Sequence, residues 1–378
     1  MLILKKLFLI LLLLLFLPAA MARAETTDCS AKAMILYEPR TGTVIAEHNA
    51  DDCLLIASTT KIMTALIVLE HASLQEIVRP TPVQVAVEGS SMYLRAGEDY
   101  TVEELLYGLL LASGNDAALA LAEHTAGSVD AFAALMNAKC AELGLNHTHF
   151  TNPHGLDDDA HYSSARDLAV ITSAAMEHAD FCRIFSTERA NVHGTCLVNH
   201  NKLLSEYDGC LGGKTGYTKA AGRVLVSCAE REGLRLICVT ISDPDDWNDH
   251  RRAYDEAFSA YRFLRLPAPE WNTVPVLSGT ARQVLISCSR PGVLLRADET
   301  FSISAELPRF VFAPVRSGEP VGRVTVLING SAAFSEPLLA AAEVQKDPAA
   351  RLTVRERFQR SWERSCRYGP YTVYPLYY

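Results

Sequence analysis

The sequence predicts an α+β domain followed by a small all-β domain, and three observations lead to this fold class. Helical and strand-like hydrophobic patterns are mixed along roughly the first 265 residues, whereas only short strand-like runs follow Pro267 and Pro269. The chain has 378 residues, enough for two domains of ordinary size. Its composition, 49% hydrophobic and 21% charged, excludes a disordered or low-complexity protein.

The elements of the first domain follow in chain order from these patterns. Residues 30–48 predict two short strands around the turn Pro39-Arg40-Thr41-Gly42. Residues 56–71 are apolar nearly all round, which predicts a buried helix. Residues 223–230 and 234–241 alternate like paired strands. Further helices are expected at 101–111, 115–126, 129–143, 164–179 and 249–263.

The second domain is expected to contain only strands. Its short β-type runs lie at 273–277, 283–288, 301–306, 309–315 and 321–328. The chain therefore divides into a leader at 1–24, an α+β domain at 25–268, a small β domain at 269–344 and a basic tail at 345–378.

The leader has the layout of a secretory signal peptide. Lys5 and Lys6 precede an apolar run at 7–17, and Ala22-Arg23-Ala24 gives a small-residue cleavage site before Glu25. The run is shorter than the roughly 20 residues that a membrane span needs, although an uncleaved anchor stays an alternative. Either reading predicts an exported protein.

The net charge of −9 is unevenly distributed. The leader carries +3 and residues 351–378 carry +4, which leaves −16 for residues 25–350. An acidic body argues against nucleic acid as a partner.

The basic tail predicts an amphipathic helix at 351–367. Its apolar side chains recur every four residues, opposite an arginine-rich face. That pattern suits a helix lying on an anionic membrane surface, with packing on the β domain as the alternative. The apolar positions are Val354, Phe358, Trp362 and Cys366, and the basic ones are Arg357, Arg360, Arg364 and Arg367.

All ten cysteines follow the leader, so export could oxidise them. No Cys-x-x-Cys occurs, which argues against a metal cluster. Cys196 with Cys210, and Cys228 with Cys238, are candidate disulfides. Buried free thiols are the alternative, because a body of this size needs no covalent staples.

The first segment with candidate chemistry lies at the start of the apolar helix, where Ser58 and Lys61 are one turn apart on one face. A serine hydroxyl needs a base, and a lysine in an apolar pocket has a lowered pKa that suits it to that role. Backbone N–H groups at the helix N-terminus would lie near a developing oxyanion. Taken alone, a capping serine followed by a solvated lysine explains the pair better.

Two further segments could complete an active site. Ser113 and Asn115 lie on a turn, where they could relay a proton and hold a carbonyl, although helix capping explains them too. Lys214 and Thr215 begin a strand, and Gly216 leaves room for substrate against the backbone. An ordinary turn and strand explains that segment equally well.

Together, in this order and about 50 and 100 residues apart, the three segments match the active-site set of penicillin-recognising serine enzymes. From about residue 30 to 265 the sequence resembles the D-alanyl-D-alanine carboxypeptidases among the low-molecular-mass penicillin-binding proteins. The resemblance implies a transpeptidase-type domain, with helices flanking an antiparallel sheet, then a small β domain and a C-terminal amphipathic helix. The matching segments outside the three motifs are 56–66, 89–94, 143–150, 154–156, 162–167 and 199–204.

The resemblance also implies a role for each residue. The reaction would remove the last D-Ala of a peptidoglycan stem pentapeptide through an acyl-enzyme, without metal or organic cofactor, and β-lactams would acylate the same serine. The implied roles are nucleophile for Ser58, base for Lys61, proton transfer to the leaving amine for Ser113, binding of the peptide carbonyl for Asn115, binding of the terminal carboxylate for Lys214 and Thr215, room for substrate for Gly216, and oxyanion stabilisation by the backbone N–H groups of Ser58 and Tyr217.

Two other functions share part of this pattern. A class A β-lactamase would also need a Glu-x-x-Leu-Asn-type loop between the second and third motifs, and none is present. A wall-binding or β-lactam-sensing protein without turnover would not need every reactive residue. The expected location is the outer face of the bacterial cytoplasmic membrane or the cell wall space.

Two polar clusters outside the three motifs have no predicted catalytic role. The histidines at 147, 149, 154 and 161 are expected to be structural or on the surface rather than zinc ligands. The acidic loop at 242–246 is unusual for the family and, if it borders the cleft, should weaken the attraction for an anionic peptide.

Overall fold

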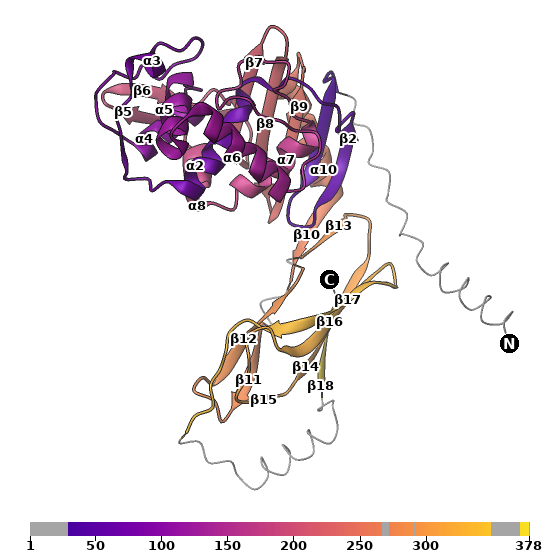
Figure 1. The fold of residues 1–378 in the computed structure, drawn as a ribbon. Helices are drawn as coiled ribbons and strands as arrows, with labels where there is room; N and C mark the ends of the chain where they lie inside the picture. Colours follow the sequence, from indigo (N-terminus) through magenta and orange to yellow (C-terminus); the bar gives the residue numbers. More distant parts are fainter. Residues whose placement is uncertain (1–28, 267–271, 291, 349–370, 378) are drawn as a thin grey trace, which may run out of the picture.

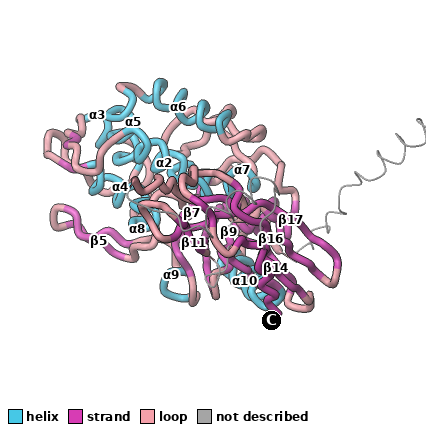
Figure 2. The backbone as a smooth tube through the Cα atoms, turned by 90° about the horizontal axis from the view of Figure 1, so that it is seen from below, coloured by secondary structure: helices cyan, strands magenta, loops and turns pink. Residues whose placement is uncertain are grey.

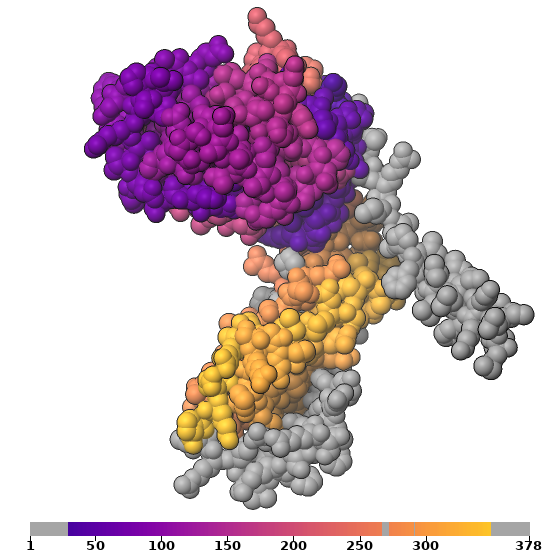
Figure 3. Space-filling view, in the orientation of Figure 1, coloured from indigo at the N-terminus to yellow at the C-terminus, as the bar shows by residue number. Residues whose placement is uncertain are grey.

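The computed structural model describes residues 29–266, 272–290, 292–348 and 371–377. A broad domain of helices around a five-stranded sheet stands on a narrower β domain (Figures 1 and 3). A two-stranded ribbon, β10 (Tyr261–Arg265) with β13 (Gly292–Arg296), joins them. The predicted α+β class with a following β domain is confirmed. The predicted signal peptide at 1–24 and the predicted amphipathic helix at 351–367 lie outside the described residues.

The sheet of the broad domain is antiparallel throughout and buried on both faces. The central strand is apolar along nearly its whole length, as a strand covered on two sides must be. Glu232 and Gly233, with φ of 49° and 80°, supply the tight turn between the two strands expected from the alternating pattern. The spatial order is β2 (Thr43–His48), β1 (Ala33–Glu38), β9 (Leu234–Ile241), β8 (Gly222–Arg231) and β7 (Cys210–Thr218).

Helices lie on both faces of this sheet (Figure 2), and alternate residues of its strands face different helical layers. Val226 and Val239 belong to the larger core, whereas Leu225 and Cys238 face the opposite side. The larger core lies beneath α2 (Lys61–His71), α4 (Val102–Leu110), α5 (Asn115–Ala126), α6 (Val129–Glu142), α7 (Ala165–Ala175) and α8 (Ala179–Phe185). The opposite face is covered by α9 (Leu203–Glu206) and α10 (Asp246–Ala260).

Smaller elements complete this domain. They are β3 (Ile77–Val78), α3 (Pro82–Val85), β4 (Tyr100–Thr101), β5 (Arg189–Val192) and β6 (Thr195–Val198).

Three predicted helices differ from those observed. The helix expected over 56–71 begins as a 3₁₀ turn, η1 (Ala57–Thr60), because the hydroxyls of Thr59 and Thr60 bond to carbonyls three residues back. The helix expected over 164–179 ends at Ala175, and α8 follows separately. The helix expected to reach residue 263 ends at Ala260, because the chain becomes extended there and pairs with β13.

The β domain is built on one seven-stranded sheet around an apolar core. All five predicted runs contain strands, but β13, β17 and β18 were missed. β13 is short, and β17 begins with small and polar residues. The spatial order is β15 (Val311–Phe312), β11 (Thr273–Leu277), β12 (Gln283–Cys288), β17 (Ser331–Ala340), β16 (Pro320–Ile328), β14 (Phe301–Pro308) and β18 (Tyr371–Tyr377).

The last strand, β18, comes from the tyrosine-rich end of the chain. It pairs antiparallel with β14, with Ser302 opposite Tyr377 and Pro308 opposite Tyr371. The end of the tail is therefore part of the β-domain sheet.

The nine cysteines of the described residues are all unbridged. Neither candidate disulfide forms. Cys228 lies opposite Ile237 and faces the larger core, whereas Cys238 faces the other side of the sheet, so their side chains point apart. No helix in the described part of the chain has both the length and the apolar character that a bilayer span requires.

Candidate active site

A cleft of about 550 Å³ opens along the edge strand β7, beside the turn that carries Ser58. Three of the eight predicted site residues, Lys61, Asn115 and Lys214, are buried and are not among the residues that line the cleft. The other five line the cleft: Ser58, Ser113, Thr215, Gly216 and Tyr217.

Ser58 and Lys61 meet at the junction of η1 and α2. Lys61 Nζ lies 3.0 Å from Ser58 Oγ, 2.7 Å from Asn115 Oδ1 and 2.7 Å from the backbone oxygen of His154. A neutral amine has two hydrogens and one lone pair. Donation to Asn115 and His154 therefore leaves the lone pair for the Ser58 hydroxyl, as a base requires.

The environment of Lys61 favours that neutral form. Its side chain is fully buried, and burial lowers the pKa of Lys61 well below its usual range. The positive charge of Lys214 lowers this pKa further, and the carboxylate of Asp116 opposes the shift. The structure thus gives Lys61 the burial on which its predicted low pKa depends.

The second motif holds Lys61 and contacts Lys214. Ser113 has a φ of 58°, a strained backbone conformation for a serine, and its hydroxyl lies 2.9 Å from Lys214 Nζ. Asn115 accepts from Lys61 through Oδ1 and donates through Nδ2 to the backbone oxygen of Glu88 at 2.7 Å. Asn115 is therefore a partner of the base, and one Nδ2 hydrogen is left for a substrate carbonyl.

Lys214 is enclosed behind the cleft rather than exposed in it. Its ammonium donates to Ser113 Oγ and, at 2.7 Å, to the backbone oxygen of Thr215. Burial lowers the pKa of Lys214 to about 7. Lys214 is thus well placed to exchange a proton with Ser113.

Replacing Lys214 with methionine is expected to stabilise the fold at pH 7 by about 2 kcal/mol, at the cost of activity. The unfolded lysine keeps its proton to about pH 10.4, whereas the folded one loses it near pH 7, so the unfolded state binds more protons between these values. Wild-type stability should therefore rise with pH over this range. Urea unfolding at pH 7 and pH 10 measures the difference between the two proteins, which should shrink at the higher pH. A difference independent of pH would contradict the buried-lysine argument.

Two glycines allow the strands and loops to close around Ser58. A Cβ on Gly216 would lie 3.0 Å from the backbone nitrogen of Ser58, so β7 approaches the nucleophile closely only with glycine there. Gly155 has a φ of 85°, and a Cβ on it would lie 1.9 Å from the backbone oxygen of Ala57.

Changing Gly155 to alanine is expected to lower the free energy of unfolding by about 3 kcal/mol and to displace the turn that carries Ser58. Gly144→Ala is the matched control, because Gly144 also has a positive φ, of 71°, but no atom within 4 Å of its added Cβ. Urea unfolding should show a loss of only about 1 kcal/mol for the control. Equal losses would mean that backbone strain, and not the contact with Ala57, explains the effect.

Sequence reasoning missed Asp116, which fixes the loop on the far side of the cleft. Its Oδ1 accepts the backbone N–H of Met92 at 3.1 Å, and its Oδ2 accepts the hydroxyl of Ser91 at 2.6 Å and the N–H of Leu94 at 3.1 Å. Asp116 directly follows the Ser-x-Asn motif and is only 1% exposed. The signal available in the sequence was a carboxylate immediately after the Ser-x-Asn motif.

The histidines have structural surroundings. Thr151 donates its backbone N–H to His161 Nδ1, which leaves the proton on Nε2, 2.8 Å from the hydroxyl of Thr60. Thr60 in turn donates to the backbone oxygen of Ala57, so this chain braces η1. Burial lowers the pKa of His154 to about 3 and that of His161 to about 4. Within the described residues, no group of three or more His, Cys, Asp or Glu is arranged to hold a metal ion.

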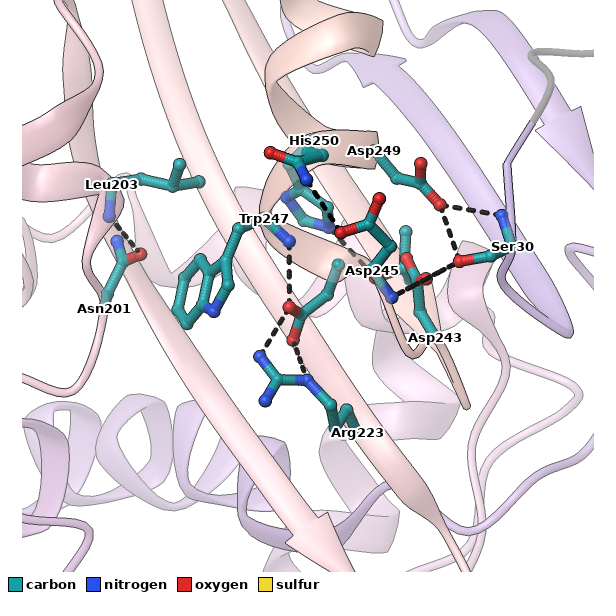
Figure 4. A network of polar contacts seen from close by, with 12 residues as sticks. Ser30, Asn201, Leu203, Arg223, Asp243, Asp245, Trp247, Asp249 and His250 are labelled. Atoms are coloured by element: carbon teal, nitrogen blue, oxygen red, sulfur yellow. Dashed lines mark hydrogen bonds and ion pairs between the residues drawn. The ribbon is translucent and has the colours of Figure 1, made fainter.

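The acidic loop borders the cleft through Asp246, whose charge is paired (Figure 4). Asp246 is paired with Arg223, with Oδ1 to Nη2 at 2.6 Å and Oδ2 to Nε at 3.1 Å. Asp243 and Asp249 are buried: Asp243 accepts the hydroxyl of Ser30 at 2.6 Å, and Asp249 accepts the backbone N–H of Ser30 at 2.7 Å. The loop therefore presents an ion pair, and not free carboxylates, to the cleft.

Comparison with known proteins agrees with this geometry. The D-alanyl-D-alanine carboxypeptidase family profile matches residues 20–245. D-alanyl-D-alanine carboxypeptidase DacF of Bacillus subtilis (strain 168) is 31% identical over 93% of this chain and 96% of its own length. The corresponding DacC of Escherichia coli (strain K12) is 31% identical over 88% and 90%. The solved structure of penicillin binding protein 5 from Haemophilus influenzae superimposes with a TM-score of 0.68 at 26% identity, over 85% of this chain and 99% of that one. The chain belongs to the D-alanyl-D-alanine carboxypeptidase family of serine peptidases, the low-molecular-mass penicillin-binding proteins.

Proposed function

We propose that this D-alanyl-D-alanine carboxypeptidase uses Ser58 as its nucleophile and Lys61 as the base that activates it. The observation that carries the proposal is the contact of 3.0 Å between Lys61 Nζ and Ser58 Oγ, made by a fully buried lysine whose two other partners are acceptors. The substrate is the peptidoglycan stem peptide, and the product is the same peptide without its last D-alanine.

Acylation follows from these positions. Ser58 Oγ attacks the carbonyl carbon of the penultimate D-alanine and gives its proton to Lys61. The backbone N–H groups of Ser58 and Tyr217 would hold the oxyanion, since Gly216 brings β7 against the Ser58 nitrogen. Collapse of the intermediate breaks the C–N bond, and the proton that Lys61 took from Ser58 passes through Ser113 to the leaving amine. Water then attacks the ester, releases the shortened peptide and returns the proton to Ser58.

Lys214 has a proposed role in that proton transfer. It touches Ser113 at 2.9 Å, and its pKa of about 7 lets it give and recover a proton near neutral pH. Thr215 and Gly216 follow Lys214 on β7 and line the cleft, where they would contact the terminal D-alanine of the substrate.

A β-lactam would acylate Ser58 and leave a stable ester, which provides the test of this proposal. Wild-type protein should release free D-alanine from a diacyl-D-Ala-D-Ala peptide, and a labelled penicillin should modify the peptide that contains Ser58. Penicillin binding without D-alanine release would favour a sensor, and rapid penicillin hydrolysis would favour a β-lactamase. Label on any other residue would contradict the assignment of Ser58.

We also propose that the enzyme acts outside the cytoplasmic membrane, with residues 351–367 resting on its anionic surface. The family acts on the cell wall, and the sequence has a signal-peptide layout and an arginine-rich face. Replacing Arg357, Arg360 and Arg364 by glutamine should reduce co-sedimentation with anionic liposomes several-fold. Internal substitution is preferable to truncation, because truncation would also remove β18 from the sheet. Unchanged binding would rule out this surface.

A further inference from the structure

We propose that Arg223 binds the free carboxylate of the terminal D-alanine and sets the preference of the enzyme for peptides that end in an acid. The inference rests on the active site proposed above and adds to it the group that recognises the end of the chain. Arg223 and its partner Asp246 both line the cleft, and neither belongs to the three motifs.

The register of the sheet places Arg223 beside Thr215. Tyr217 lies opposite Arg223, and Thr215 lies opposite Leu225. Residues directly opposite one another in an antiparallel pair share a face, and so do residues two apart on one strand. Thr215 and Arg223 are therefore diagonal neighbours on the same face, and a long side chain can span that separation.

The guanidinium is fixed, and one side of it is open. Nε and Nη2 are taken by Asp246, whose Oδ1 also accepts the backbone N–H of Trp247 at 2.8 Å. The Trp247 ring lies 5.8 Å from the guanidinium carbon (Figure 4). Among the described residues, none accepts a hydrogen bond from Nη1, and the Arg223 side chain is 43% exposed. A carboxylate could therefore bind Nη1 without displacing Asp246.

The other cations near the cleft are poorly suited to this task. Lys214 points its ammonium at Ser113 and at the backbone oxygen of Thr215, and Lys61 is enclosed behind Ser58. Burial lowers the pKa of both lysines, so neither holds a full charge at every physiological pH. Burial and the charge of Lys214 also lower the pKa of His200, which lines the cleft. Arg223 is the one arginine or lysine among the described lining residues, and a guanidinium stays charged.

A purely structural role is the competing explanation, because the Arg223–Asp246 pair also holds the acidic loop against β8. The two explanations differ in what they predict for substrates. A recognition residue affects only peptides with a terminal carboxylate, whereas a loosened loop would slow the hydrolysis of every peptide.

The test compares two diacyl-D-Ala-D-Ala peptides that differ only in ending as the free acid or as the carboxamide. The measured quantity is the ratio of kcat/KM for the acid to kcat/KM for the amide. Arg223→Gln should lower this ratio by about 10- to 100-fold, the range expected for losing a charged hydrogen bond, and Arg223→Lys should recover part of it. Arg235→Gln is the matched control, because Arg235 also pairs with a carboxylate, Glu230 at 2.8 Å, but lies outside the cleft. Its ratio should equal that of the wild type.

A pH series on the unmodified enzyme provides the second measurement and does not depend on the folding of a variant. Recognition by Arg223 predicts an acid-to-amide ratio that is the same at pH 6 and pH 9. Recognition by Lys214 predicts a ratio that falls as the pH rises through about 7. A falling ratio, or equal losses on both peptides in Arg223→Gln, would overturn the proposal. Failure of the Ser58 assignment would be seen separately, as retained hydrolysis of both peptides by Ser58→Ala.

Discussion

Alanine at position 58 is expected to lower D-alanine release by at least about 10⁴-fold, because it removes the atom that forms the acyl-enzyme. Loss of a nucleophile that acts as a unit with its base costs nearly as much as loss of the whole set. Labelled penicillin should no longer attach covalently, since the ester has no oxygen to form on. The variant should still fold, because the lost hydroxyl contacts Lys61, and Lys61 keeps Asn115 and the backbone oxygen of His154 as partners.

Ser90→Ala is the matched control for this variant. Ser90 also lines the cleft, but its contact with the site runs through its backbone oxygen, which accepts the N–H of Asn115 at 2.7 Å. Its loss of activity should stay below about tenfold, as expected for a residue without a role in proton or acyl transfer. Near-normal D-alanine release by Ser58→Ala would refute the assignment of the nucleophile.

Methionine at position 61 is expected to lower kcat/KM by about 10⁴-fold while leaving penicillin and peptide able to enter the cleft. Methionine has nearly the length of lysine and needs no proton, so it suits a site where the lysine is fully buried. It leaves Asn115 Oδ1 and the backbone oxygen of His154 without a donor, and each costs about 1–3 kcal/mol if left unpaired. Removal of the buried amine offsets part of that loss.

The variant Lys61→Arg tests whether Lys61 acts as a base or only through its positive charge. A guanidinium keeps its charge but cannot give up its proton in a protein, so it cannot accept the proton of Ser58. Rates of penicillin acylation for the two variants should therefore be similarly low. Substantial acylation by Lys61→Arg would mean that Lys61 acts through its charge.

The sequence predicted best the features that depend on local pattern. The alternation at 223–230 and 234–241 gave β8 and β9, and the spacing of Ser58 and Lys61 gave a pair that the structure places in contact. The splitting of the first helix was missed, because it depends on the hydroxyls of Thr59 and Thr60 bonding to nearby carbonyls. Hydrophobic periodicity does not distinguish that tight turn from an ordinary helical one.

Features that depend on contacts distant in sequence could not be predicted in this way. Arg223 and Asp246 are both ordinary surface-type residues in the sequence, and only the fold of β8 against α10 joins them at the cleft. Lys214 was predicted to bind the terminal carboxylate of the substrate, and the contact of its ammonium with Ser113, 101 residues earlier in the chain, could not be predicted from the sequence. The role of Asp116 could not be predicted either, since its hydrogen-bond partners lie 22 to 25 residues earlier in the chain.

The position of β18 in its sheet bears on how the protein is made. β14 has β16 on one side and β18 on the other, so the hydrogen-bonding groups on its outer edge have no partner strand until the last residues arrive. During synthesis from the N-terminus the outer edge of β14 therefore stays open until β18 has been made, after the larger domain can already have folded. An open edge is a site for pairing with another chain, so chains that lack β18 should be more prone to aggregate than chains that contain it.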